Sequence, residues 1–169
     1  MFRDDCVPRF WRSVCIGLCA LLWAGSGVAA EPETRLALVI GIANYVHAPE
    51  LVTPVKDAEA IAERLRALDF EVELQLDLGN RELAGVLRDF GIRASTADVA
   101  VIYYAGHGVQ VDGTNYLVPA DAQLERVRDL LYEAVPLPLF LGELAGAQKL
   151  GIMILDACRD NPFVERLVQ

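Results

Sequence analysis

Short apolar runs alternate along the chain with segments in which apolar residues recur every three or four positions. Residues 35–42 (RLALVIGI) are continuously apolar after the first position, which predicts a strand buried on both faces. Residues 98–105 (DVAVIYYA) and 149–155 (KLGIMIL) share this pattern. Residues 70–76 instead alternate between apolar and polar positions, which predicts a half-buried strand nearer an edge of the sheet.

Two amphipathic helices are predicted, one between the strands at 35–42 and 70–76 and one between the strands at 70–76 and 98–105. Apolar residues recur at helical spacing after Pro54, in a segment that ends near Asp69. A second such segment begins at Asn80, a candidate N-cap, and reaches about Gly91. The alternation of strands and helices predicts one α/β domain over residues 31–169, a three-layer α/β/α arrangement with a mostly parallel sheet.

The regular alternation stops after residue 108. Asp112-Gly113 lies between two short strand-like segments, VQV and NYLV, and predicts a hairpin. A looser stretch to about Pro138 then leads into a short helix before the last apolar run.

The first thirty residues differ in composition from the rest of the chain. Arg3, Arg9 and Arg12 precede an uncharged run over residues 13–30 that ends in Val-Ala-Ala, as in a secretory signal peptide. We expect cleavage after Ala30, export to the periplasm or the medium, and no stable membrane insertion of the mature chain. The alternative is an uncleaved leader that remains as a membrane anchor, because a run of this length nearly spans a bilayer.

The chain is acidic, with a formal net charge of −9 at pH 7. This charge repels phosphate backbones, and no basic cluster offsets it, so we expect no nucleic-acid binding. Of the four cysteines, Cys6, Cys15 and Cys19 lie in the predicted leader, which leaves Cys158 in the mature chain. By itself this thiol is compatible with a buried residue, an intermolecular disulfide or a reactive group.

Two polar segments follow predicted central strands: Gly106-His107-Gly108, and the segment DACRDNPF that begins at Asp156. In open parallel sheets the loops beyond the carboxyl ends of the strands carry the chemistry, so His107 and Cys158 are expected to share one crevice. An imidazole can accept the proton of a thiol and later protonate a leaving amine. Gly106 and Gly108 would let the main chain turn beside the imidazole and direct an N–H group at a developing oxyanion.

These segments also carry a family resemblance. LALVIGIANY, VKDAEAIAERLRALDFEV, VIYYAGHGVQVDGTNYLVPAD and LGIMILDACRDNPF together resemble the large-subunit half of bacterial caspase-like cysteine peptidases, the metacaspase and orthocaspase group. The resemblance covers residues 35–165. It implies a caspase-haemoglobinase fold and a cysteine-type endopeptidase, with His107 and Cys158 as its catalytic dyad.

The resemblance further implies cleavage of protein or peptide substrates after Arg or Lys. The acidic residues of the basic-residue pocket would be Asp156 and Asp57, and two carboxylates would suit a guanidinium or ammonium group. The alternatives are a helix-start charge for Asp57 and a turn residue for Asp156. Ala105 departs from the serine that some metacaspases have two residues before the histidine.

No organic cofactor is implied, and the sequence has no regularly spaced oxygen ligands for a metal. Some members of the family bind calcium, so the resemblance alone would allow calcium dependence, and we predict no metal site. After the first strand, Asn44 and Tyr45 match residues that shape the crevice in the family, or they form a turn.

Family members continue beyond the nucleophile into a small-subunit half, whereas this sequence stops at Gln169. We therefore expect a C-terminally truncated domain in which the strand at 149–155 has an exposed apolar edge. The alternative to an active peptidase is a truncated, non-catalytic module that binds a partner through this edge.

Overall fold

The computed structural model describes residues 32–158 together with Phe163 and Leu167. The predicted leader at residues 1–30 lies outside the described residues. The strands are β1 (Arg35–Gly41), β2 (Glu71–Leu76), β3 (Val99–Val111), β4 (Thr114–Leu117), β5 (Val135–Pro136) and β6 (Leu150–Cys158). The helices are α2 (Pro54–Arg66), α3 (Asn80–Ala94), α4 (Leu130–Glu133) and α5 (Leu137–Leu144), with a 3₁₀ turn at Val127–Asp129.

The strands form a six-stranded mixed sheet. β2, β1, β3 and β6 lie side by side in that order and are all parallel. β4 and β5 continue the sheet from the far end of β3 in antiparallel orientation. The mostly parallel sheet expected from the sequence is therefore confirmed, and the half-buried β2 lies at an edge.

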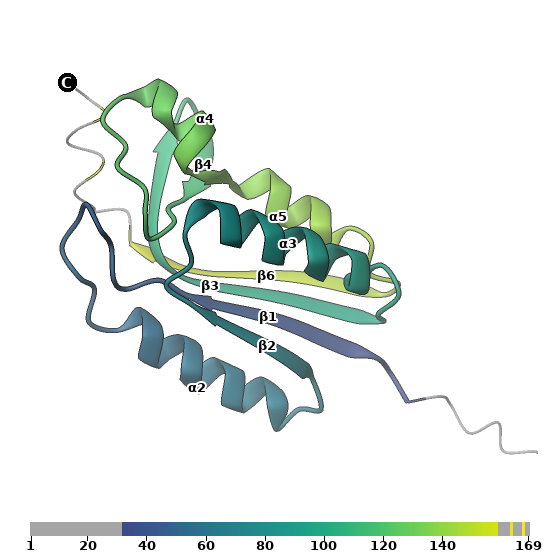
Figure 1. The fold of residues 1–169 in the computed structure, drawn as a ribbon. Helices are drawn as coiled ribbons and strands as arrows, with labels where there is room; N and C mark the ends of the chain where they lie inside the picture. Colours follow the sequence, from purple (N-terminus) through teal and green to yellow (C-terminus); the bar gives the residue numbers. More distant parts are fainter. Residues whose placement is uncertain (1–31, 159–162, 164–166, 168–169) are drawn as a thin grey trace, which may run out of the picture. The chain divides into compact units, whose positions relative to one another are not determined.

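Helices cover both faces of the parallel strands (Figure 1). Alternate residues of β1 explain this arrangement, because successive side chains of a strand point to opposite faces. Val39 packs with Ala58 and Ala62 of α2, whereas Leu38 and Ile40 belong to the larger core on the opposite face. That larger core also takes in α3 and α5 through residues such as Leu83, Phe90, Phe140 and Leu144. The three-layer α/β/α fold predicted from the pattern is confirmed.

The Asp112-Gly113 hairpin is confirmed as well. Both residues have positive φ, 49° and 79°, as two-residue hairpin loops of this type require. Val111 pairs with Thr114 directly across the turn.

The predicted N-cap of α3 is one residue off. Gly79 occupies the N-cap, and the Glu82 carboxylate accepts the Gly79 N–H at 3.1 Å. Asn80 is the first helical residue, and its N–H donates to Asp121 Oδ1 at 2.8 Å. The first turn thus obtains its acceptors from two carboxylates rather than from the Asn80 side chain.

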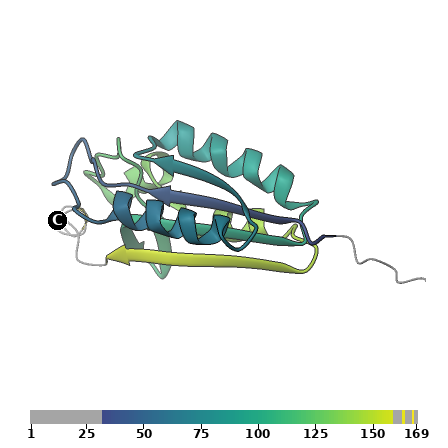
Figure 2. The same ribbon diagram turned by 90° about the horizontal axis from the view of Figure 1, so that it is seen from below.

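Within the described part of the chain, β6 pairs only with β3, and Figure 2 shows it along the lower margin of the sheet. Leu150, Ile154 and Leu155 are 40–50% exposed there. No helix in the described ranges is long and apolar enough to cross a membrane.

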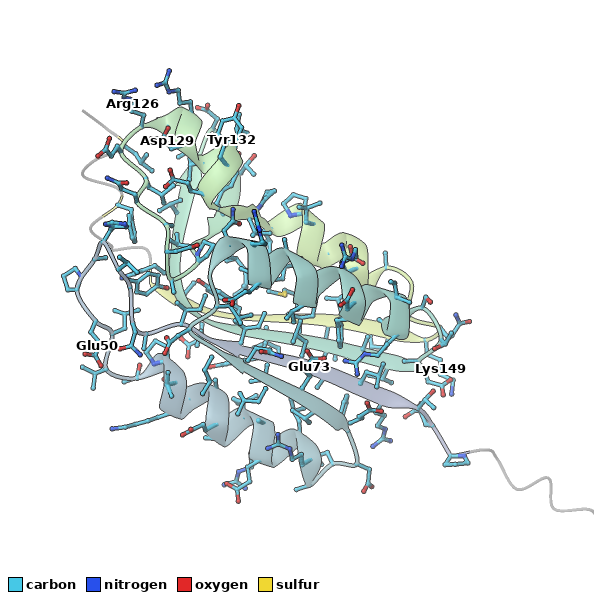
Figure 3. The ribbon with its side chains drawn as sticks, viewed as in Figure 1. Glu50, Glu73, Arg126, Asp129, Tyr132 and Lys149 are labelled. Carbon is cyan, nitrogen blue, oxygen red and sulfur yellow. The ribbon has the colours of Figure 1, made fainter. Side chains whose placement is uncertain are left out.

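At the end of the sheet where β1 begins, an ion-pair network joins the residues that precede β1, β3 and β6. The Lys149 ammonium lies 3.0 Å from Asp98 and 3.4 Å from Glu33, and Figure 3 shows it at the end of the sheet opposite Glu50. Thr34 donates to Asp98 Oδ2 through both its N–H and its hydroxyl, each at 2.9 Å. The network lies away from the loop that follows β1.

Candidate active site

His107 and Cys158 are register partners on the neighbouring parallel strands β3 and β6. Neighbouring strands lie about 5 Å apart, so the two backbones are adjacent at this point. The side chain of Cys158 lies outside the described part of the structure. The backbone arrangement therefore places the two residues next to each other, and the crevice that we expect them to share stays a prediction.

The His107 side chain is 3% exposed and lies among aromatic rings. Its ring centroid is 4.6 Å from that of Tyr45 and 5.7 Å from that of Phe163. Neither Nδ1 nor Nε2 has a hydrogen-bond partner among the described residues. Burial lowers the pKa of His107 below its ordinary value, because the charged imidazolium would lose its hydration. The neutral form, which can accept a proton, is therefore favoured.

Two tyrosine hydroxyls hold the main chain of His107. The N–H of His107 donates to Tyr45 Oη at 2.7 Å, and the Tyr104 hydroxyl donates to the His107 carbonyl at 2.8 Å. Burial raises the pKa of Tyr45 to about 12 and raises that of Tyr104 as well. Both hydroxyls therefore keep their protons at neutral pH.

The segment Gly106-His107-Gly108 is not the loop that the sequence predicted. β3 continues through it to Val111, because Gly106 pairs with Ala157 of β6 and Gly108 with Leu117 of β4. Gly106 has a φ of +156°, so the strand deviates there without ending. The proposed oxyanion role of the two glycine N–H groups stays a prediction. DACRDNPF was likewise expected to be a loop, but its first three residues belong to β6.

Asp57 and Asp156 line one small pocket of about 80 Å³. Asp57 lies in the first turn of α2, and Asp156 lies on β6 opposite Ala105 of β3. The other lining residues come from the loop before α2 and from β3: Leu51, Val52, Thr53, Pro54, Ala105 and Gly106. The structure thus brings together the two carboxylates singled out in the sequence, beside an apolar wall.

Tyr103 of β3 contacts one of the two pocket carboxylates. Its hydroxyl donates to Asp156 Oδ2 at 3.2 Å. Burial raises the pKa of Tyr103, and the negative charges of Asp156 and Asp57 raise it further. Tyr103 therefore remains a neutral donor to Asp156.

The loop after β1 is fastened by Asp77. Asp77 Oδ1 accepts the N–H groups of Ala43 at 2.7 Å and Asn44 at 2.9 Å, and Oδ2 accepts the Asn44 side-chain amide at 2.6 Å. Partial burial opposes ionisation, but these donors outweigh it and lower the pKa of Asp77. The loop that carries Tyr45 is thereby tied to the end of β2.

Sequence reasoning missed Tyr103, Asp77 and Phe163. Tyr103 and Tyr104 are consecutive in a strand, so the pattern already puts them on opposite faces, but it does not say which polar groups they meet. Asp77 and Phe163 carry no periodic signal. Among residues 32–158, 163 and 167, no three His, Cys, Asp or Glu side chains cluster as a metal site.

Comparisons with known proteins identify relatives of this chain. The family described as the caspase domain matches residues 34–167. The chain is 33% identical over 128 residues to human mucosa-associated lymphoid tissue lymphoma translocation protein 1, and 32% identical to its mouse homologue. Each match covers 75% of this chain but only 15% of the relative.

The fold is also similar to a solved structure. The crystal structure of protein GSU0716 from Geobacter sulfurreducens superposes with a TM-score of 0.58 at 21% sequence identity. The match covers 79% of this chain and 53% of that chain. At this level of identity the likeness concerns the fold alone.

Proposed function

The chain belongs to the caspase-domain family, and on this basis we propose that it is a cysteine endopeptidase with Cys158 as nucleophile and His107 as base and acid. The observation that carries the proposal is the register of β3 and β6, which pairs the Cα atoms of these two residues. The buried, neutral imidazole of His107 supports the role of a base. The substrates are proteins or peptides.

The proposed reaction has two steps. His107 accepts the proton of the Cys158 thiol as the sulfur attacks the scissile carbonyl carbon, and the same proton then passes to the leaving amine as the C–N bond breaks. The resulting thioester is hydrolysed by a water molecule. His107 accepts a proton from this water and returns it to the sulfur as the acid product leaves. A nearby backbone N–H, such as that of Gly106 or Gly108, would stabilise the oxyanion.

Specificity for Arg or Lys is the finer part of the proposal. Asp57 and Asp156 face one pocket, and two carboxylates would bind a cationic side chain by charge-assisted hydrogen bonds. Leu51 and Pro54 of the same pocket offer apolar contact for the methylene stem of Arg or Lys. Ala105 lines this pocket too, so the missing serine removes one polar contact from it.

The dyad is tested by covalent labelling of the full chain with an Arg-directed, thiol-reactive substrate analogue, read by intact mass. We expect one label per chain in the wild type and none in Cys158→Ala or His107→Ala. His47→Ala is the matched control, since His47 is the other of the two histidines and is exposed. Labelling that survives in folded His107→Ala at the wild-type rate would remove His107 from the mechanism.

The pocket is tested separately from the dyad. Asp156→Asn and Asp57→Asn should each reduce kcat/KM on Arg peptides by roughly tenfold or more, and much less on peptides with neutral citrulline in place of Arg. Asp112→Asn, in the hairpin away from the pocket, is the control for a general loss of charge. Equal losses on both peptides would exclude the pocket as a cation site.

Export is part of the proposal and rests on the sequence of residues 1–30. Mass spectrometry of the mature amino terminus tests it. A first residue at Glu31 supports cleavage, whereas an intact Met1 in the membrane fraction supports the anchor.

A further inference from the structure

Tyr45 makes two distinct contacts with His107. Its hydroxyl oxygen accepts the His107 N–H at 2.7 Å, and its ring lies against the imidazole with a centroid distance of 4.6 Å and an interplanar angle of 46°. Tyr45 is itself 7% exposed. One side chain thus touches both the main chain and the ring of the same histidine.

Among the described residues, no polar group forms a hydrogen bond with the imidazole and orients it. In Ser-His-Asp triads a carboxylate bonded to one ring nitrogen fixes the orientation of the imidazole. Here neither ring nitrogen has a described hydrogen-bond partner, and the ring packs edge-on against Phe163 as well as against Tyr45. Its orientation therefore depends on packing and on the position of its own backbone.

The position of Tyr45 is well determined. Asp77 holds the preceding residues Ala43 and Asn44 through their N–H groups, and the Tyr45 hydroxyl also faces the Val118 carbonyl at 3.4 Å. A methyl group at Gly106 would lie 2.8 Å from the Tyr45 Oη, so the hydroxyl is packed tightly against β3. Because Tyr45 is held in place, its contacts can fix the position of His107.

We propose that Tyr45 is a positioning residue for His107, whose hydroxyl fixes the histidine main chain while its ring fixes the plane of the imidazole. The inference deepens the proposed function, since it assumes that His107 is the catalytic base. Loss of the hydroxyl should therefore reduce the chemical step more than it reduces substrate binding.

The test compares Tyr45→Phe, which removes one oxygen atom, with Tyr45→Leu, which also removes the ring. Tyr132→Phe is the control, because Tyr132 is 76% exposed and lies on α4. We expect Tyr45→Phe to lower kcat on Arg peptides by roughly tenfold with KM nearly unchanged, and Tyr45→Leu to lower it further. A fall in kcat for Tyr132→Phe of the same size would overturn the inference.

A second readout does not depend on peptidase activity. The chain has only two histidines, so ¹⁵N-histidine labelling gives NMR signals that a His47→Ala variant assigns. In Tyr45→Phe we expect faster amide exchange at His107 by about tenfold and a shift of its imidazole resonances, with His47 unchanged. Unchanged His107 signals in a folded Tyr45→Phe variant would overturn the inference.

The two readouts separate failure of the inference from failure of the proposed function. If the wild type hydrolyses no peptide and takes no label, the proposed function of this chain fails, and the His107 signals alone decide whether Tyr45 positions this side chain. If Tyr45→Leu does not fold, Tyr45→Phe carries the test, because it keeps the ring and the packing.

Discussion

His107 of β3 lies directly opposite Cys158 of β6, at the end of a nine-residue parallel pairing that begins with Val99 and Leu150. A slip of one residue would move every side chain of β6 to the other face of the sheet. Gly151 opposes such a slip. A slip would put a residue with a Cβ in its place, and a Cβ at this position would lie 2.7 Å from the Leu144 carbonyl oxygen of α5. The meeting of the two candidate catalytic residues is thus a property of the strand register.

Gly106→Ala should destabilise the fold. Gly106 has a φ of +156°, and an added Cβ would lie 2.8 Å from both the Tyr45 and Tyr104 hydroxyls. We expect the free energy of unfolding to fall by roughly 1–3 kcal/mol, measured by urea denaturation. Gly85→Ala is the control: nothing lies within 4 Å of a Cβ there, and in the middle of α3 it should add about 0.5–1 kcal/mol. Similar changes in both variants would contradict the strain at Gly106.

Tyr103→Phe should weaken the binding of cationic substrates. The substitution removes the 3.2 Å hydrogen bond that holds Asp156 at the pocket. We expect KM for Arg peptides to rise about three- to tenfold with kcat nearly unchanged, in steady-state kinetics. Tyr116→Phe, on β4, serves as the control. A fall in kcat on neutral peptides as well would indicate a structural defect instead.

Lowering the pH through the range in which histidine is protonated should destabilise the fold, because His107 is buried. Burial lowers the pKa of His107 from its ordinary value of 6.5, so the unfolded chain binds a proton before the folded chain does. The free energy of unfolding should therefore fall as the pH drops below 6.5, until the folded His107 is also protonated. Urea denaturation between pH 7.5 and 5.5 measures this.

A folded His107→Asn variant should lack that dependence, and His47→Ala should keep it. If His107→Asn shows the same pH dependence as the wild type, another group is responsible.

Asp98→Asn should loosen the other end of the sheet. Hydrogen bonds from Thr34, followed by the interaction with Lys149, lower the pKa of Asp98 from 3.8 to about 2. Its carboxylate therefore stabilises the fold above pH 3.8, and this contribution is lost as the pH falls towards 2. We expect a lower urea midpoint for the variant at pH 7 and a smaller difference at pH 3. Asp89→Asn, at an exposed ion pair with Arg88, should leave the midpoint nearly unchanged.

Apolar periodicity was sufficient to predict the layers and most of the elements. β1 and α2 follow directly from it, and the Asp-Gly turn follows from its need for positive φ. The end of β3 could not be predicted in this way. Two glycines around His107 resemble a turn locally, but pairing with β6 and β4 keeps the segment extended. Long-range pairing outweighed local propensity there.

Some features of the candidate site could be predicted from the sequence as well, and others could not. The family resemblance and the sheet topology led us to expect Asp57 and Asp156 at one pocket and His107 beside Cys158. The two aspartates do line one pocket, and the strand register places the backbones of His107 and Cys158 side by side, while the roles of all four residues stay predictions. The contact between Tyr45 and His107 joins residues 62 positions apart and depends on side-chain packing, to which hydrophobic periodicity does not extend. The anchoring of the Tyr45 loop by Asp77 is of the same kind.

The order of the strands along the chain also determines when each part of the candidate site is synthesised. β1, β2 and β3 can assemble with α2 and α3 while the chain is still on the ribosome, but β6 follows β3 in the chain, and Cys158 emerges about fifty residues after His107. At ordinary rates of translation this interval is on the order of several seconds. During it a nascent chain holds the imidazole without the thiol, so the proposed dyad is complete only after β6 has been made.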